Sequence, residues 1–252
     1  MNTTFGIGNV LGTGIRIWVK NFAPFMLITA LIYSPLWIWG ITTVHGEMTI
    51  EKLLAAARVE QFQALLVLLL NVFVSAALTY GVVMELRGQR ASLGACIATG
   101  LGRFFPALGS AMLSALCILG GSFLIIPGII LMCMLYVTTP AAVLERPGVL
   151  GALKRSRELT HGHKFEIFGL CFIMLLAAFA LGKLVQTMTL PHLTERAYLD
   201  ETMRNFPTYM YVNLVLQMVL GSLNAAMAAV AYYFLRSEKE GTSADELAQI
   251  FD

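Results

Sequence analysis

Residues 104–144 read FFPALGSAMLSALCILGGSFLIIPGIILMCMLYVTTPAAVL, and this stretch decides the fold of the chain. It runs for 41 residues without a charged side chain. A helix of about 20 residues already crosses the hydrocarbon core of a membrane, and one unbroken helix over this stretch would measure roughly 60 Å. We expect the break at Pro127-Gly128, because proline cannot donate to the helix ladder and glycine frees the turn.

Two structures satisfy such a break. The first is a full helical hairpin that turns at the outer leaflet, and the second is a re-entrant pair that turns inside the bilayer. Both begin and end on the same side of the membrane, so the charges of the flanking loops do not separate them. The turn carries no polar side chain. We therefore expect it to be packed against protein or to lie at shallow depth, since bare backbone is costly in lipid.

Composition extends the membrane assignment to the whole chain. Of its 252 residues, 58% are hydrophobic and only 13% are charged, whereas soluble domains carry about 25% charged residues. So few charges cannot cover the surface of a soluble domain of this length. We predict an all-α polytopic membrane protein with about six transmembrane helices, at Phe22–Val44, Phe62–Glu85, Phe104–Ile126, Gly128–Leu144, Phe165–Met188 and Thr208–Leu235. Residues 1–236 form one integral membrane domain in this interpretation, and 237–252 form a short cytoplasmic tail.

Basic residues orient the spans. Twelve of the 17 fall on one side of the predicted membrane: Arg16, Lys20, Arg87, Arg90, Arg103, Arg146, Lys154, Arg155, Arg157, Lys164, Arg236 and Lys239. Lys and Arg are enriched in cytoplasmic loops. We therefore expect a multi-pass protein of a bacterial cytoplasmic (inner) membrane with both termini in the cytoplasm.

A short motif recurs three times. Each copy opens with a Leu-Gly pair and precedes two predicted spans; the copies begin at Leu11, Leu93 and Leu150. This layout predicts three parallel repeats, roughly 5–86, 90–145 and 148–236, each made of an interfacial helix and a helical hairpin. Basic side chains of these segments are expected at the membrane surface: Arg16, Lys20, Arg103, Lys154, Arg155, Arg157 and Lys164. The segments either cap the bundle or bind anionic lipid, and the sequence leaves both open.

Polar side chains follow one face of two predicted spans. Asn213, Gln217 and Asn224 recur at helical spacing in the last span, and Asn71, Ser75 and Thr79 do so in the second. They form either hydrogen bonds between helices or a polar cavity for a lipid headgroup or a small solute.

Catalytic and ligand-binding motifs are absent from the sequence, which contains neither a nucleophile elbow, a paired-histidine zinc motif nor a phosphate loop. We therefore predict no enzyme activity, no cofactor and no metal site. A net charge of +2 gives no reason to expect nucleic acid as a partner.

Three neighbouring segments resemble a known family. Residues 124–130 read LIIPGII, residues 139–145 read TPAAVLE, and residues 148–163 read GVLGALKRSRELTHGH. This pattern is similar to that of bacterial YciC-like inner-membrane proteins and of the membrane domain fused to some glycerophosphodiester phosphodiesterases. The resemblance implies an integral membrane module and no particular reaction.

The leading functional prediction is a non-catalytic scaffold or accessory subunit of the cytoplasmic membrane. It would contact the lipid bilayer, with anionic lipid as a candidate ligand, and a cytoplasmic or membrane protein as a candidate partner. The alternative is a transporter or lipid-translocating protein with a polar cavity between helices 2 and 6.

Overall fold

The computed structural model describes residues 5–43, 50–189 and 195–241; within these, residues 39, 41–43, 50–64 and 195–207 are described by their backbone alone. The described chain is helical and contains no strand. Its helices are α1 (Ile7–Lys20), α2 (Phe22–Thr43), α3 (Ile50–Leu86), α4 (Leu93–Gly102), α5 (Phe104–Ser122), α6 (Ile125–Met134), α7 (Thr138–Glu145), α8 (Gly148–Thr160), α9 (Lys164–Thr189) and α10 (Glu195–Glu240).

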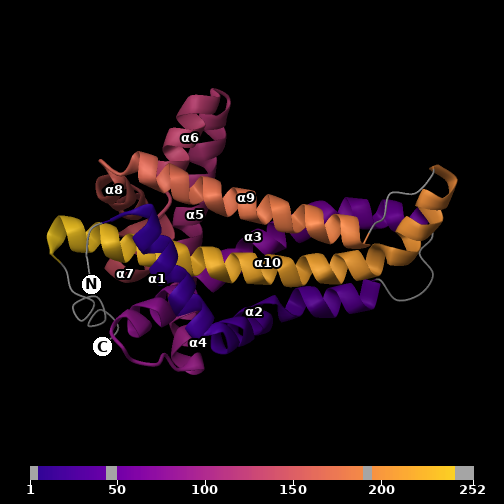
Figure 1. Ribbon diagram of the computed structural model, residues 1–252, viewed down its shortest axis with the longest axis horizontal. Helices are drawn as coiled ribbons and strands as arrows, with labels where there is room; N and C mark the ends of the chain where they lie inside the picture. Colours follow the sequence, from indigo (N-terminus) through magenta and orange to yellow (C-terminus); the bar gives the residue numbers. More distant parts are fainter. Residues whose placement is uncertain (1–4, 44–49, 190–194, 242–252) are drawn as a thin grey trace.

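Four long helices, α2, α3, α9 and α10, lie along the long axis of the molecule (Figure 1). Helix α10 packs against each of the other three. Their shared core is apolar and includes the fully buried side chains of Tyr33, Leu78 and Met227. This arrangement follows from helices that are apolar all round, which can be buried on one side by protein and on the other by lipid.

The prediction of a helical, multi-pass chain is confirmed at the level of length and composition. Five stretches among the described residues are long and apolar enough to cross a membrane: Leu65–Leu86, Phe104–Ser122, Ile125–Glu145, Lys164–Thr189 and Thr208–Glu240. A sixth arises if α1 and α2 count as one span, but the two are bent by 79°.

Short helices gather at one end of the bundle. Helices α1, α4, α7 and α8 lie there, with α1 crossing over α10 (Figure 1). Contacts α1·α10, α3·α4 and α7·α8 hold them in place. Along the chain, α1 precedes α2 and α3, α4 precedes α5 and α6, and α8 precedes α9 and α10.

The predicted break at Pro127-Gly128 is wrong by a few residues. The turn lies at Phe123-Leu124, and both Pro127 and Gly128 belong to the first turn of α6. Proline is tolerated there because the N–H groups of a first helical turn have no partner in the helix. Glycine is needed because a Cβ at residue 128 would lie 2.9 Å from Cα of Ser122 on α5. The two residues therefore fit α6 closely against α5 after the turn.

Helix ends differ from the predicted spans in other places. The span predicted at Gly128–Leu144 is divided into α6 and α7 by a break at residues 135–137. Helix α3 begins at Ile50, well before Phe62, and α10 continues to Glu240. The domain boundary predicted at residue 236 therefore falls inside α10, and most of the predicted tail lies outside the described residues.

Candidate functional site

The polar residues predicted in the second and last spans meet where α3 crosses α10. A Cβ at Gly221 on α10 would lie 2.5 Å from Oδ1 of Asn71 on α3. The amide nitrogen of Asn71 is itself bound, donating to the carbonyl oxygen of Val67 at 3.1 Å. Close approach of helices at a glycine is common in membrane bundles. At this level the seam between α3 and α10 is therefore closed by the Asn71 side chain.

A third helix adds a polar group to the same place. Tyr33 on α2 is fully buried, and its hydroxyl oxygen lies 3.8 Å from the Cβ position of Gly221. Polar atoms from α2 and α3 thus converge on a glycine of α10. A buried hydroxyl is expected to find a hydrogen-bond partner, yet among the described residues the Tyr33 hydroxyl has none, and Asn71 is a polar side chain beside it.

The remaining predicted polar residues do not form one lining. The Thr79 hydroxyl donates to the carbonyl oxygen of Ser75 at 2.7 Å, within α3. Asn213 and Gln217 are half-buried on α10. Asn224 is exposed and accepts from the hydroxyl of Tyr136 at 3.5 Å, at the break between α6 and α7. The structure therefore brings Asn71 to the seam and turns Asn224 toward a different neighbour.

Helix α1 is docked on α10 by a polar contact that the sequence did not reveal. The indole nitrogen of Trp18 donates to the hydroxyl of Ser222 at 3.0 Å, and Ser222 is fully buried. One turn earlier, a Cβ at Gly14 would meet the sulfur of Met227 at 2.5 Å. The inward face of α1 is therefore fixed by protein.

Charged side chains join α7, α8 and the end of α10. The guanidinium of Arg155 donates from Nε to Oε1 of Glu145 at 2.8 Å and pairs with Glu240. Arg236 donates from Nε to Oε2 of Glu240 at 3.0 Å and lies 3.7 Å from Glu145. We call these four residues, Glu145, Arg155, Arg236 and Glu240, the ionic cluster. Its two carboxylates are shared between two guanidinium groups, so each charge has a partner.

Tyr232 on α10 forms hydrogen bonds with two residues of the ionic cluster. Its hydroxyl donates to Glu145 and accepts from Arg236 at 3.1 Å. Partial burial alone would lower the pKa of Arg155, but its bonds to Glu145 and Glu240 outweigh that and raise the pKa of the guanidinium. In the sequence, Glu145 ends the stretch TPAAVLE, residues 139–145. The pattern did not show which cations would meet the carboxylate.

The chain was compared with known proteins. The model of the domain of unknown function DUF7847 matches residues 10–235. The chain belongs to this family. No curated protein and no solved structure matches. The match to DUF7847 takes in the seam and the α1–α10 contact, and its description assigns no activity. The resemblance to YciC-like proteins is not tested by it and stays a prediction.

The basic residues predicted at the membrane surface divide into two groups within the DUF7847 region. Arg16, Lys154 and Arg157 are exposed. Lys20 pairs with the buried carboxylate of Glu85, and Arg103 and Lys164 are half-buried. Burial and the neighbouring charge of Arg146 lower the pKa of Arg103. Lys20 is exposed like the first three, but it differs from them in its pairing with a buried carboxylate of α3.

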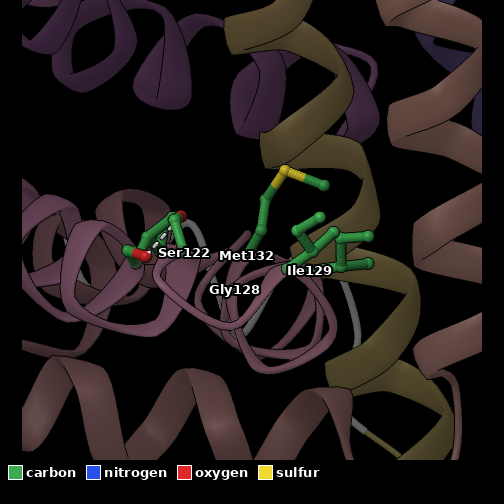
Figure 2. Close-up of a pocket in the computed structure, with 6 residues that line it drawn as sticks. Ser122, Gly128, Ile129 and Met132 are labelled. Carbon is green, nitrogen blue, oxygen red and sulfur yellow. Dashed lines mark hydrogen bonds between the residues drawn. The ribbon is translucent and has the colours of Figure 1, made fainter.

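A shallow hollow lies on the α5–α6 hairpin of this DUF7847 chain. Its volume is about 240 Å³, and it is lined by Ile118, Ser122, Ile125, Gly128, Ile129 and Met132. Figure 2 shows Ser122 on α5 beside Gly128, Ile129 and Met132 on α6. The hydroxyl of Ser122 donates to the carbonyl oxygen of Ile118 at 2.7 Å. The lining therefore offers apolar contact and carries no titratable group.

Metal ligands are not grouped in the part of the chain that the structure describes, where no three His, Cys, Asp or Glu side chains come together. The four cysteines of this DUF7847 chain, Cys96, Cys117, Cys133 and Cys171, are free thiols. The absence of a metal and of a cofactor stays a prediction from the sequence.

Proposed function

We propose that the chain is a non-catalytic integral membrane protein of a bacterial cytoplasmic membrane, acting as a scaffold or accessory subunit. The observation that carries this proposal is the closed seam between α3 and α10. Oδ1 of Asn71 lies 2.5 Å from the position that a Cβ at Gly221 would occupy, so the two helices are in contact where a cavity between them was predicted. The polar residues of the two helices then serve as interhelical contacts, each contributing about 0.6 kcal/mol.

Cytoplasmic placement of both ends of the described chain is part of the proposal. The backbone N–H of Phe5 donates to Glu238 near the end of α10. Lys239 donates to the carbonyl oxygens of Glu158 and His161 on and after α8. These bonds gather the start of the described chain, α8 and the end of α10. Twelve of the 17 basic residues belong to loops and helices of this end, which supports its cytoplasmic orientation.

Three parallel repeats that touch lipid are the second part of the proposal. Each short helix leads into a long one, and an exposed phenylalanine stands at each junction: Phe22 is 44% exposed, Phe105 79% and Phe165 90%. Exposed cations stand on two of these short helices, Arg16 on α1 and Arg157 on α8. Apolar side chains beside cations are typical of interfacial helices on anionic membranes. The order of elements and these junctions support the repeat and its contact with anionic lipid.

Mass spectrometry tests this function on the full chain extracted in native-lipid discs, against a mock extraction. A stoichiometric protein partner supports the accessory role, and selective enrichment of anionic lipid supports the lipid contact. The matched variant carries Arg16→Gln, Lys154→Gln and Arg157→Gln, which leaves the ionic cluster intact. We expect it to lose the lipid enrichment. A chain that recovers neither a partner nor a selected lipid contradicts the proposal.

Lipid translocation is the alternative function, and one observation favours it. The Asn71 carbonyl and the buried Tyr33 hydroxyl, which has no hydrogen-bond partner among the described residues, both lie close to Gly221, so polar groups gather among three helices. In vesicles that contain the chain and a fluorescent lipid, translocation would move labelled lipid from the inner to the outer leaflet. An external quencher would then reach that label.

The double variant Asn213→Leu with Gln217→Leu separates the two functions. Loss of translocation at unchanged thermal stability favours the transporter, whereas lowered stability alone identifies these residues as packing contacts. Val212→Leu with Val215→Leu, on the exposed side of α10, is the matched control. Absence of translocation by the parent chain leaves the scaffold function as the proposal.

A further inference from the structure

The tip of the α5–α6 hairpin is a continuous exposed apolar surface. Residues 122–127 are all exposed. Phe123 is 93% exposed, and Leu124, Ile125 and Ile126 are each exposed by at least 71%. In Figure 1 the hairpin runs across the long axis of the bundle, and α6 projects beyond α9. An exposed apolar surface of this size is typical of a site that lipid or another protein covers.

The base of the hairpin is fixed at the end of the bundle that carries the short helices. Ala107, Ser110 and Ser114 are buried on α5, and a Cβ at Gly109 would lie 2.8 Å from Cγ2 of Val149 at the start of α8. From residue 115 to residue 127 no side chain is buried. The first half of α5 is thus anchored in protein, and its second half leaves the bundle together with α6.

The projecting part is too short to cross a membrane. Helix α6 has 10 residues, which measure about 15 Å at 1.5 Å per residue. A hydrocarbon core is about 30 Å thick. Together α6 and α7 are long enough to cross a membrane, but most side chains of α7 are buried and it packs against α5 and α8. Only α6 and the second half of α5 project from the bundle, and this projecting part reaches through one leaflet at most.

The backbone of the turn is adapted to hydrocarbon. Only Phe123 and Leu124 stand outside the two helices, and the N–H of Leu124 donates to the carbonyl oxygen of Gly121 at 3.1 Å. Pro127 has no N–H at a position of α6 where it would lack a helical acceptor. The hydroxyl of Ser122 is bound to the carbonyl oxygen of Ile118. Each of these features removes one polar group of the turn that would otherwise need water, which the interior of a bilayer favours.

The distribution of charges near the helix connections also favours a hairpin turn in hydrocarbon. In the other two pairs of long helices the second helix carries charges in its first turns after the connection, Lys52 and Arg58 in α3 and Arg196 and Arg204 in α10. The hairpin turn carries none. A connection that emerged into water on the far side would expose four bulky apolar side chains there.

We propose that the α5–α6 hairpin is a re-entrant element, inserted sideways among the acyl chains of the leaflet next to the short helices. It turns within that leaflet and never reaches the opposite surface, so only α2, α3, α9 and α10 cross the membrane. The partner of this surface is lipid hydrocarbon. The inference is independent of the scaffold role, since it concerns depth in the membrane and not what the protein assembles with.

Spin-label depth measurement tests the proposal on the full chain in phosphatidylcholine and phosphatidylglycerol vesicles. The four native cysteines are replaced by alanine, and one cysteine is introduced as Phe123→Cys or, independently, Ile126→Cys. Leu176→Cys on the exposed face of α9 is the control in hydrocarbon. Gln89→Cys, in the exposed loop between α3 and α4, is the control in water. Collisions with oxygen report hydrocarbon, and collisions with a water-soluble nickel chelate report water.

We expect labels at residues 123 and 126 to collide with oxygen as often as the label at residue 176, and with nickel several-fold less often than the label at residue 89. Nickel access equal to that at residue 89 would place the tip in water on either side and overturn the proposal. Low access to both reagents would also overturn it, because the tip would then be covered by protein such as a second copy. Agreement between the two tip positions guards against a local effect of one label.

Discussion

Asn71 on α3 and Gly221 on α10 are complementary in shape: the amide oxygen of Asn71 lies 2.5 Å from the place that a Cβ at residue 221 would occupy. The pair is 150 residues apart in the chain, and it fixes how closely the two central helices approach. A single contact of this kind sets the register of α3 along α10.

Gly221→Ala should lower the stability of the fold by about 2 kcal/mol, because the new methyl group displaces the Asn71 side chain from its bond to Val67. Thermal unfolding in detergent measures the change. The control is Gly182→Ala on α9, where a Cβ would meet nothing within 4 Å. Equal midpoints for the two variants would show that the seam tolerates a side chain and would reopen the question of a cavity there.

Gly100→Ala on α4 should destabilise by about 1–3 kcal/mol. A Cβ at residue 100 would lie 2.9 Å from Cβ and 3.1 Å from Cα of Ala77 on α3, and that backbone cannot rotate away. Gly94→Ala on the same helix meets nothing within 4 Å and should be neutral or stabilising, since alanine favours a helix. The same unfolding measurement compares them, and a harmless Gly100→Ala would contradict the close packing of α4 on α3.

Arg155→Met should cost about 2 kcal/mol, because it removes one of the two guanidinium groups that pair with the carboxylates of Glu145 and Glu240 and leaves Arg236 to serve both. Lys154→Met removes a side chain that is 80% exposed and should change the free energy of unfolding by less than about 0.5 kcal/mol. Urea or thermal unfolding of both variants provides the measurement. The prediction fails if the two substitutions are equivalent, since the ionic cluster would then contribute nothing.

A chain that ends at Arg236 should be less stable than one that ends at Gly241. The five residues between them contain Lys239, which binds the carbonyl oxygens of Glu158 and His161, and Glu240 of the ionic cluster. The comparison isolates these contacts from residues 242–252, which both chains lack. Yield in the membrane and the unfolding midpoint are the quantities to compare. Identical values would show that residues 237–241 add nothing to stability, in agreement with the domain boundary predicted at residue 236.

Much of the fold could be predicted because it depends on local composition. Helices α2 and α9 begin and end within a residue of the predicted spans, since each is a run of apolar residues bounded by polar ones. The break within residues 104–144 followed from length alone. Its position did not, because Pro127 can stand in a first helical turn as well as in a loop. The close contact between Gly128 and Ser122 is what places Pro127 in a first helical turn and not in a loop.

The candidate sites were less predictable. Helical spacing places Asn213, Gln217 and Asn224 on one side of an isolated helix, but α10 has neighbours around most of its circumference. Asn224 meets Tyr136 as a result, while the seam is made by Gly221, a residue without a side chain. The four charges of the ionic cluster come from α7, α8 and α10. No pattern along the chain shows which carboxylate will face which guanidinium.

The sequence by itself determined that this chain is helical, rich in membrane-length apolar segments and broken within its longest one. These properties follow from hydrophobicity and helix length, which are summed over neighbouring residues. Only the tertiary structure decided that Asn71 closes on Gly221, that Glu145 holds Arg155, and that the α5–α6 hairpin runs across the bundle. Each of these depends on how distant helices approach one another, and a difference of one methyl group at a contact changes that approach.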